Sequence, residues 1–230
     1  MRASDSVPVD RLLASCPNKE AIGQVKADVS RLLMNDYPNA ALLVWNSLHS
    51  NSEFRDSDLN PAAGRILTNI NFSRELDDAG FNWRINRTPG MHVRRLTERR
   101  SLEFSFDGSE PELATLLFQP VVLVGGTTYQ LDCRIRSEAS DERGFSWRLV
   151  ELTTGKTLES GAGEASSRHK ELLSWIFQTP SSSRTLVLAF TYARPAGEVR
   201  KAGKVELSDL MLYAISDKVM PVKASGSPRN

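Results

Sequence analysis

Two related segments carry the side chains best suited to recognising a ligand. They read Gly-Phe-Asn-Trp-Arg-Ile, containing Trp83 and Arg84, and Gly-Phe-Ser-Trp-Arg-Leu, containing Trp147 and Arg148. In a strand, successive side chains point to opposite faces, so each tryptophan shares a face with apolar neighbours and each arginine lies on the polar face. The two indole rings could form a platform that stacks on a sugar, with the arginines as hydrogen-bond donors. Alternatively, both tryptophans are core residues, a cross-strand aromatic pair, and each arginine pairs with a carboxylate such as Glu206.

Arginine is concentrated in residues 84–100. This stretch has arginines at positions 84, 87, 94, 95, 99 and 100 and one acid, Glu98. A basic patch of this kind can meet phosphate or an acidic polysaccharide. It lacks the interleaved aromatic residues that single-strand nucleic-acid binders use. The alternative interpretation is a solvated hairpin whose arginines pair with acids from elsewhere in the chain.

Residue types that serve catalysis do not fall into a motif. His49, His92 and His169 are scattered, and no His-x-x-x-His or Cys-x-x-Cys spacing supports a metal site. There is no Gly-x-Ser-x-Gly nucleophile elbow. Glycoside cleavage needs two facing carboxylates, and nothing marks such a pair among the 28 acidic residues. We therefore expect a protein that is not an enzyme.

The charge balance excludes a general nucleic-acid binder. The 230-residue chain has 29 basic and 28 acidic side chains, a formal charge of +1, whereas wholesale capture of nucleic acid needs a clearly basic face. No apolar run approaches the ~20 residues of a membrane span. Residues 1–16 are polar and show no apolar signal core, so they do not reveal a location. Cys133 alternates in phase with apolar neighbours and is expected to be a buried thiol, while Cys16 lies in the N-terminal stretch.

Residues 1–64 are expected to form an N-terminal arm with two helices. Apolar residues recur every three or four positions over 19–33, and a second helix is expected over 39–48. Two helices of ~10–15 residues cannot bury their apolar faces alone. The pair must therefore dock, either on the following domain, with Trp45 as the docking residue, or on helical repeats outside this sequence.

From residue 65 to residue 216 the apolar residues alternate with a period of two. The alternating ranges are 66–72, 81–85, 101–106, 127–135, 145–150, 172–177, 185–192 and 205–213, and a longer run, bent near Pro120, covers 113–124. Many short strands without intervening long helices predict a mainly β fold, either an antiparallel sandwich or a barrel. Residues 217–230 contain Pro, Ser, Gly and Lys and are expected to form a disordered tail.

Several short motifs follow one another in a distinctive order over residues 65–215. They are Leu67-Thr68-Asn69-Ile70-Asn71-Phe72-Ser73, the segment 80–85, Leu117-Phe118-Gln119, Gly126-Thr127-Thr128-Tyr129, and the closing Val205-Glu206-Leu207-Ser208-Asp209-Leu210-Met211-Leu212. This order resembles the jelly-roll carbohydrate-binding modules of the galactose-binding-like type. The resemblance implies an antiparallel jelly-roll β-sandwich, preceded here by the helical hairpin, that binds a polysaccharide or oligosaccharide without catalysis. A helical N-terminus leading into Gly-Phe-x-Trp-Arg-Ile also resembles the end of some bacterial tetratricopeptide proteins, including ones tied to exopolysaccharide production.

The chain departs from that family where relatives often bind a structural calcium. Ile70 and Ser73 replace the Gly and Glu of the family's opening strand, and Ser208 replaces the first Asp of its closing motif. Asp209 matches the second Asp. Because calcium takes several oxygen ligands, the resemblance leaves Asp209 as the candidate metal ligand of a weakened calcium site.

The resemblance implies a bacterial protein of surface-polysaccharide production or export, for which a periplasmic or extracytoplasmic location is favoured. Its partners would be a polysaccharide and other proteins of a polysaccharide assembly. The alternative is a protein-interaction or scaffolding module that has lost sugar binding and whose helical arm continues a repeat array. Exposed rings at Trp83 and Trp147, lining a groove with Arg84 and Arg148, would favour sugar binding. Buried rings would favour scaffolding.

Overall fold

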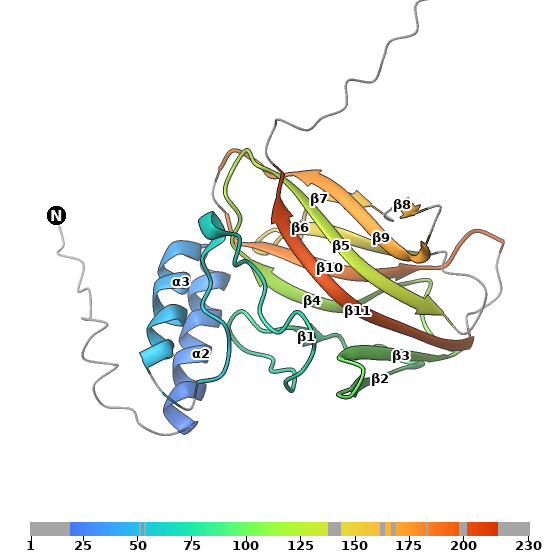
Figure 1. The fold of residues 1–230 in the computed structure, drawn as a ribbon, viewed down its shortest axis with the longest axis horizontal. Helices are drawn as coiled ribbons and strands as arrows, with labels where there is room; N and C mark the ends of the chain where they lie inside the picture. The colour runs from blue at the N-terminus through green and yellow to red at the C-terminus, as the bar shows by residue number, and fades with distance from the viewer. Residues whose placement is uncertain are drawn as a thin grey trace, which may run out of the picture.

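The computed structural model describes residues 19–215 except 51, 53, 138–143, 162–163, 167–168, 183 and 198–201, and shows two sheets with a helical hairpin at one end (Figure 1). The hairpin consists of α2 (Lys19–Met34) and α3 (Pro38–Ser47), followed by the short 3-10 helices η1 (Leu48–Ser50) and η2 (Pro61–Ala63). Both predicted helices are confirmed to within two residues. The predicted tail 217–230 and Cys16 lie outside the described residues.

One sheet, named here the β10 sheet after its central strand, has the strand order β1-β4-β10-β6-β7. Its strands are β1 (Arg84–Ile85), β4 (Leu113–Val121), β10 (Leu186–Ala193), β6 (Phe145–Glu151) and β7 (Thr157–Gly161). All neighbouring strands pair antiparallel. The register between β10 and β4 shifts at Phe190/Thr191, which marks a β-bulge.

The second sheet, named the β11 sheet, has the order β2-β3-β11-β5-β9-β8 and is also antiparallel. Its strands are β2 (Met91–Leu96), β3 (Ser101–Asp107), β11 (Ala202–Ala214), β5 (Thr128–Ser137), β9 (His169–Gln178) and β8 (Glu164–Ser166). From β3 to β6, and again from β9 to β11, each connection carries the chain to the other sheet. These crossings join the sheets into a jelly roll, so the predicted antiparallel jelly-roll sandwich is confirmed.

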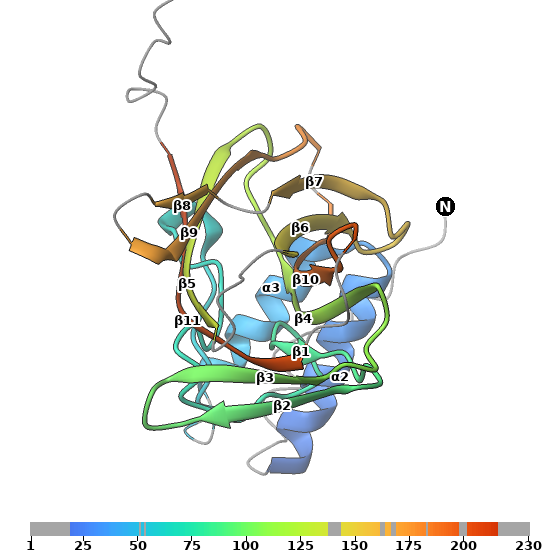
Figure 2. The same cartoon turned by 90° about the vertical axis from the view of Figure 1, so that its right-hand side faces the viewer.

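The main core lies between the two sheets (Figure 2). Alternate residues of the central strands supply it, for example Phe145, Trp147 and Leu149 of β6 and Leu188 and Phe190 of β10. The intervening residues of the same strands point away from the core, because strand side chains alternate between faces. Each sheet therefore has one outer face that is not buried by the other sheet.

Two of the predicted strands are wrong. Residues 66–72 form turns, with left-handed backbone at Asn69 (φ 45°) and Phe72 (φ 48°), and of residues 81–85 only Arg84 and Ile85 pair as a strand. The Asn69 side chain holds this irregular path by bonding the backbone N–H and C=O of Arg74. Strands β2, β7 and β8 had no counterpart in the sequence prediction. The other seven predicted strands are present with small changes at their ends.

The helical hairpin packs on the end of the sandwich through a second apolar cluster. This cluster joins Val29 and Leu33 of α2 to Phe81 and Val122 of the sandwich region. Trp45, fully buried, packs edge-on against Phe81 with 5.7 Å between ring centroids, as expected for the docking residue. Among the described residues, neither helix is both long and apolar enough to cross a membrane.

Polar contacts also hold the helical hairpin against the sandwich. The Lys26 ammonium group lies 2.7 Å from Asp77 and 3.0 Å from Asp56, and only 13% of its side chain is exposed. The carboxylate of Asp36 accepts a hydrogen bond from the backbone N–H of Thr185, which comes just before β10. The hairpin is therefore tied to the sandwich by charge as well as by apolar packing.

The predicted burial of the Cys133 thiol is confirmed, and it leads to a pH-dependent expectation. Burial raises the pKa of Cys133 to about 12, although the Trp147 indole N–H donates to its sulfur. The unfolded thiol ionises near pH ~8.5. The stabilisation of the fold by this neutral thiol is thus complete below that pH and is lost progressively as the pH rises towards 12.

This behaviour can be measured in a Cys16→Ser variant, which leaves Cys133 as the one thiol. We expect no reaction with a thiol reagent at pH 8 until denaturant is added, and then one thiol per chain. Urea unfolding at pH 7, 9 and 10 should show a loss of stability that the additional change Cys133→Ala reduces. Rapid labelling of the native protein would contradict the buried position.

Candidate functional site

Two of the predicted ligand-binding residues, Arg84 and Arg148, lie in one row across the outer face of the β10 sheet. Arg84 of β1 is opposite Phe118 of β4, Phe118 is opposite Ala189 of β10, and Ala189 is opposite Arg148 of β6. Ser160 of β7 continues the row. Three strand spacings of ~4.8 Å put the two arginine backbones ~14 Å apart. The sequence pattern placed both arginines on a polar face, and strand pairing makes it the same face.

The centre of this row is sheltered even though it points away from the main core. Val187, Ala189 and Thr191 of β10 are 7%, 4% and 2% exposed, and the first two do not belong to the apolar cluster between the sheets. On both sides, the longer side chains Phe118 and Arg148 are half-buried. In the row through Ala189, a small residue of the central strand thus lies between the longer Phe118 and Arg148, and Val187, Ala189 and Thr191 form the floor of this surface.

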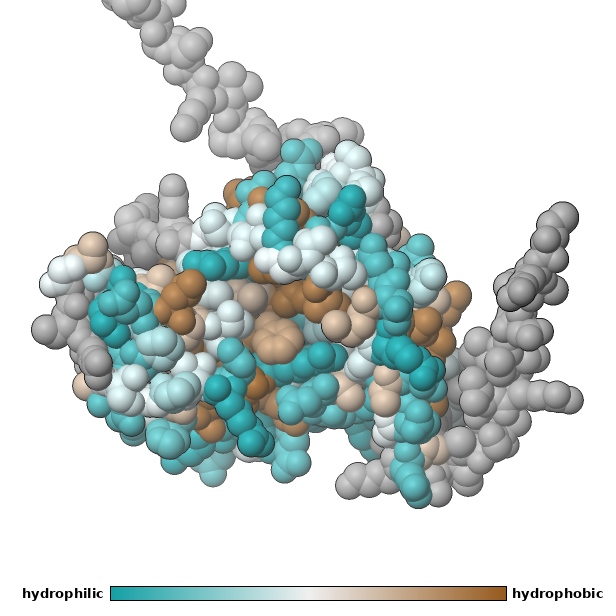
Figure 3. Space-filling view, turned by 180° about the vertical axis from the view of Figure 1, so that it is seen from behind, coloured by the Kyte–Doolittle hydropathy of each residue, from teal (hydrophilic) through white to brown (hydrophobic). Residues whose placement is uncertain are grey.

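We call this surface the β10 face. It comprises Thr115 and Phe118 of β4, Val187, Ala189 and Thr191 of β10, and Ser146, Arg148 and Val150 of β6, with Arg84 and Ser160 at its edges. Figure 3 views the molecule from the side on which the β10 sheet lies, and an apolar band crosses its middle between hydrophilic margins. The β10 face thus combines an apolar centre with hydroxyl and guanidinium groups.

Arg84 is held in place by the helical hairpin. One of its guanidinium nitrogens donates to the carbonyl of Gly80 at 3.0 Å and to the hydroxyl of Ser30 in α2 at 3.3 Å. Its guanidinium carbon lies 6.0 Å from the centre of the Phe118 ring. Burial lowers the pKa of Arg84, while the nearby Asp77 and Asp78 act in the opposite direction. Arg84 therefore forms a fixed cationic edge beside Phe118.

Arg148, at the other side of the floor, is half-buried, and the structure shows no hydrogen bond or ion pair for it with any described residue. The predicted partner of either arginine, Glu206, instead contacts Arg99 and accepts a hydrogen bond from Ser101 on the β11 sheet. Beside Arg148, the hydroxyls of Ser146 and Thr191 are 2.8 Å apart. Thr191 is 2% exposed and its hydroxyl also donates to the carbonyl of Ser146, so within this pair the half-buried Ser146 hydroxyl is the group that can bond a ligand.

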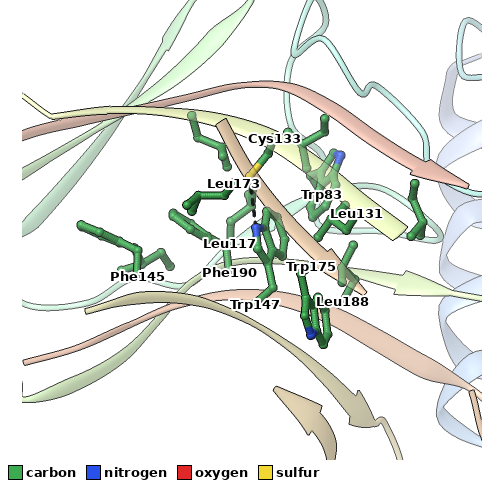
Figure 4. Packing of buried hydrophobic residues seen from close by; sticks show 14 of the residues in the cluster. Trp83, Leu117, Leu131, Cys133, Phe145, Trp147, Leu173, Trp175, Leu188 and Phe190 are labelled. Carbon is green, nitrogen blue, oxygen red and sulfur yellow. Dashed lines mark hydrogen bonds between the residues drawn. The ribbon is translucent and has the colours of Figure 1, made fainter. Parts of the chain in front are cut away.

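Trp83 and Trp147 are core residues, as in the alternative interpretation of the sequence. They are 0% and 1% exposed, and their ring centroids are 6.3 Å apart between the sheets. The indole N–H of Trp83 donates to the carbonyl of Thr68, and that of Trp147 donates to the sulfur of Cys133 (Figure 4). Neither ring offers a face to solvent, so the platform expected from these two residues is absent from the surface.

The aromatic side chain on the β10 face is Phe118, which the sequence pattern did not mark as a candidate ligand-binding residue. It occupies the variable position of the Leu-Phe-Gln step. The neighbouring Gln119 is fully buried and donates to the Thr68 hydroxyl at 2.6 Å. The β-bulge turns both Leu116 and Leu117 towards the core. Because of this break in the alternation, the sequence pattern does not predict which side of the sheet Phe118 faces.

Asp209 lies in an irregular part of β11, with left-handed backbone (φ 53°) between two register-matched stretches. Its carboxylate is 3.2 Å from Nε of Arg134 and its side chain is 63% exposed. Within the part of the chain that the structure describes, no three His, Cys, Asp or Glu side chains come together as a metal site requires. The structure therefore gives the predicted calcium role of Asp209 no support and shows an ion pair in its place.

The arginines of the stretch 84–100 contact different partners in the structure. Arg94 pairs with Glu103 at 3.0 Å and Arg99 with Glu206 at 3.3 Å, both on the outer side of the β11 sheet. Arg95 donates to the carbonyl of Ser73. Arg94 and Arg99 therefore pair with acids outside the stretch, as the alternative interpretation of the sequence expected, whereas Arg95 bonds a backbone carbonyl. Two of the six arginines of the stretch are thus neutralised by ion pairs, while the side chains of Arg87 and Arg100 show no partner among the described residues.

A polar network lies on the outer face of the β11 sheet. Asp132 accepts hydrogen bonds from Gln130 at 2.9 Å and from the hydroxyl of Tyr213 at 2.8 Å. Burial and the neighbouring carboxylate raise the pKa of Tyr213 to about 12. The polar groups of this network bond one another, whereas the guanidinium of Arg148 on the β10 face shows no partner among the described residues.

No family model matches this chain, and no curated protein matches it. Among solved structures, one of CBM4 has a TM-score of 0.43 and 10% identity, covering 59% of this chain and 88% of that chain. Accessory secretory protein 1, 2 and 3 of Streptococcus pneumoniae gives 0.40 and 16%, covering 58% and 92%. A carbohydrate-binding module from Cellvibrio mixtus lichenase 5A, in complex with cellotriose, gives 0.34 and 11%, covering 57% and 92%. At these values the similarity assigns neither a family nor a ligand to the chain.

Proposed function

We propose that this protein is a non-catalytic module that binds a polysaccharide or oligosaccharide on the β10 face. The observation that carries the proposal is the cross-strand row in which Phe118 lies between two arginines beside a floor of small residues. Sugar rings present apolar C–H faces and polar rims. An aromatic ring can pack against the C–H face, and fixed donors can bond the hydroxyls.

The β10 face matches both parts of a sugar ring. Phe118, Ala189 and Val187 offer apolar contact, whereas the Arg148 guanidinium and the Ser146 hydroxyl offer polar groups that can bond sugar hydroxyls. The row is long enough for more than one sugar ring, so a chain could lie across the strands. The buried positions of Trp83 and Trp147 count against the sugar platform expected from the sequence. In the proposal, Phe118 is the aromatic residue that packs against the sugar.

The absence of catalysis is part of the proposal. Among the described outward residues of β4, β10 and β6 on this face there is no carboxylate or imidazole, the groups that general acid–base catalysis most often uses. We further propose, from the sequence resemblance alone, that the module acts in the production or export of a bacterial surface polysaccharide, in a periplasmic or extracytoplasmic location.

The proposal is tested by titration calorimetry with a panel of neutral and acidic oligosaccharides. For a bound oligosaccharide, Phe118→Ala should weaken the affinity about tenfold, because a packed aromatic ring contributes ~1.5 kcal/mol. Ile176→Ala serves as the matched control, since Ile176 is 57% exposed on the other sheet and its loss should leave the affinity unchanged. The proposal is wrong if no glycan in the panel binds, or if the two variants weaken binding equally.

A second candidate function, scaffolding through the helical hairpin, is favoured by exposed apolar side chains there. Met34, Tyr37 and Leu43 are 58%, 61% and 72% exposed on the hairpin. Such residues could pack against a helical protein partner of a polysaccharide assembly. Cross-linking of the full chain should then capture a partner that Leu43→Glu loses. A strictly monomeric protein without partners would eliminate this candidate.

A further inference from the structure

Arg148 differs from the other half-buried arginines of the described chain. Each of the others has a protein partner: Arg74 pairs with Asp56, Arg84 bonds Gly80 and Ser30, Arg95 bonds Ser73, Arg134 pairs with Asp209, and Arg194 pairs with Glu112. For Arg148 the structure shows no hydrogen bond and no ion pair with any described residue. A half-buried guanidinium with no partner among the described residues keeps its donors available to a ligand.

We infer that the glycan bound by the β10 face is an acidic one, and that Arg148 binds its carboxylate or sulfate group. This inference rests on the proposed function. The guanidinium presents a planar fork of donors that matches an oxyanion in a bidentate manner. Ala189 and Ser160, its neighbours across the strands, are small and leave the fork accessible from above the sheet.

The surroundings of Arg148 favour an anion over a neutral sugar. None of the outward residues of β4, β10 and β6 that form the face is acidic, so no described carboxylate of the face competes for the guanidinium. The second cation of the row, Arg84, has Asp77 and Asp78 nearby, and its guanidinium is fixed by hydrogen bonds to Gly80 and to Ser30 of the hairpin. An oxyanion entering the face would therefore meet one available guanidinium, Arg148, above an apolar floor where water competes less.

The test uses matched oligosaccharides that differ only in charge. Oligogalacturonate and oligoalginate are compared by calorimetry with the same chains after reduction of their carboxylates to alcohols, and dextran sulfate is compared with dextran to separate sulfate from carboxylate. We expect at least one acidic chain to bind tenfold or more tightly than its neutral counterpart, because its oxyanion forms charge-assisted hydrogen bonds with the guanidinium. Its affinity should fall as sodium chloride is raised from 50 to 300 mM, because salt screens the ion pair.

Variants separate the role of Arg148 from a general effect of charge. Arg148→Gln should abolish the preference for the acidic chain, and Arg148→Lys should retain part of it, because lysine keeps the charge and loses the fork. Arg99→Gln removes the same charge from a side chain 68% exposed on the other sheet and should leave the preference intact. Thermal unfolding of each variant verifies that the fold is kept.

The outcomes distinguish this inference from the proposed function. Equal binding of acidic and neutral chains, or a preference that survives Arg148→Gln, overturns the inference and leaves a glycan-binding module in place. Failure of the wild-type protein to bind any of these chains, acidic or neutral, overturns both.

Discussion

Replacing Trp147 by alanine is expected to lower the free energy of unfolding by ~3–5 kcal/mol, the usual cost of truncating a fully buried Trp. The ring is 1% exposed and packs against Trp83 and against Phe190, at centroid distances of 6.3 and 5.0 Å. Its removal would leave a cavity between the sheets that rigid strands on both sides cannot close. The sulfur of Cys133 would also lose its hydrogen-bond donor.

Urea unfolding followed by circular dichroism measures this loss as a shift of the midpoint. Trp147→Phe is the matched control, because it keeps an aromatic ring in the space and should cost clearly less than the alanine variant. A loss below ~1 kcal/mol for Trp147→Ala, the range of a surface substitution, would contradict a core position. Trp147 would then return as a candidate for ligand contact.

Gly80→Ala is expected to destabilise the docking of the helical hairpin by ~2–4 kcal/mol, combining left-handed backbone strain with overpacking. Gly80 has φ 62°, and a Cβ atom there would lie 2.5 Å from Cζ3 of Trp45, a ring that is fully buried. The ring cannot withdraw, because Phe54 and Phe81 pack against it. The hairpin must therefore shift, and Arg84, which donates to the carbonyl of Gly80, must shift with it.

Gly64→Ala is the matched control, because it introduces the backbone strain without the clash. Gly64 has a similar φ of 78°, but a Cβ atom there would meet nothing within 4 Å. Gly64→Ala should thus show the strain alone, and its loss of stability in thermal and urea unfolding should be clearly the smaller of the two. Equal losses would mean that Trp45 does not rest against Gly80.

The alternation of apolar residues predicted most of the sandwich because strands with one buried face must show it. It also predicted correctly that the tryptophans and arginines of the two related segments lie on opposite sides of the chain. It failed at residues 66–72, where an equally apolar segment is held in turns by polar contacts. Gln119, 51 positions away, donates to the Thr68 hydroxyl, and the Asn69 side chain bonds the backbone of Arg74. Side-chain contacts of this kind leave no periodic signal in the sequence.

The sequence could not predict which residues share the β10 face, for a related reason. Arg84 and Arg148 are 64 positions apart in the numbering, and only the pairing of β1 with β4, β4 with β10 and β10 with β6 brings them into one row. Phe118 joins that row because a β-bulge changes the phase of β4. Local patterns report the face of a side chain within one strand and do not report the register between strands.

The most direct test of a glycan-binding β10 face is a map of backbone amide ¹H–¹⁵N chemical shifts during titration with a bound oligosaccharide. Glycan binding at this face predicts that the largest shifts cluster at Phe118, Ala189 and Arg148, on three neighbouring strands, while the outer face of the β11 sheet around Asp132 and Tyr213 stays unchanged. Shifts confined to the β11 sheet or to the helical hairpin at saturation would contradict it.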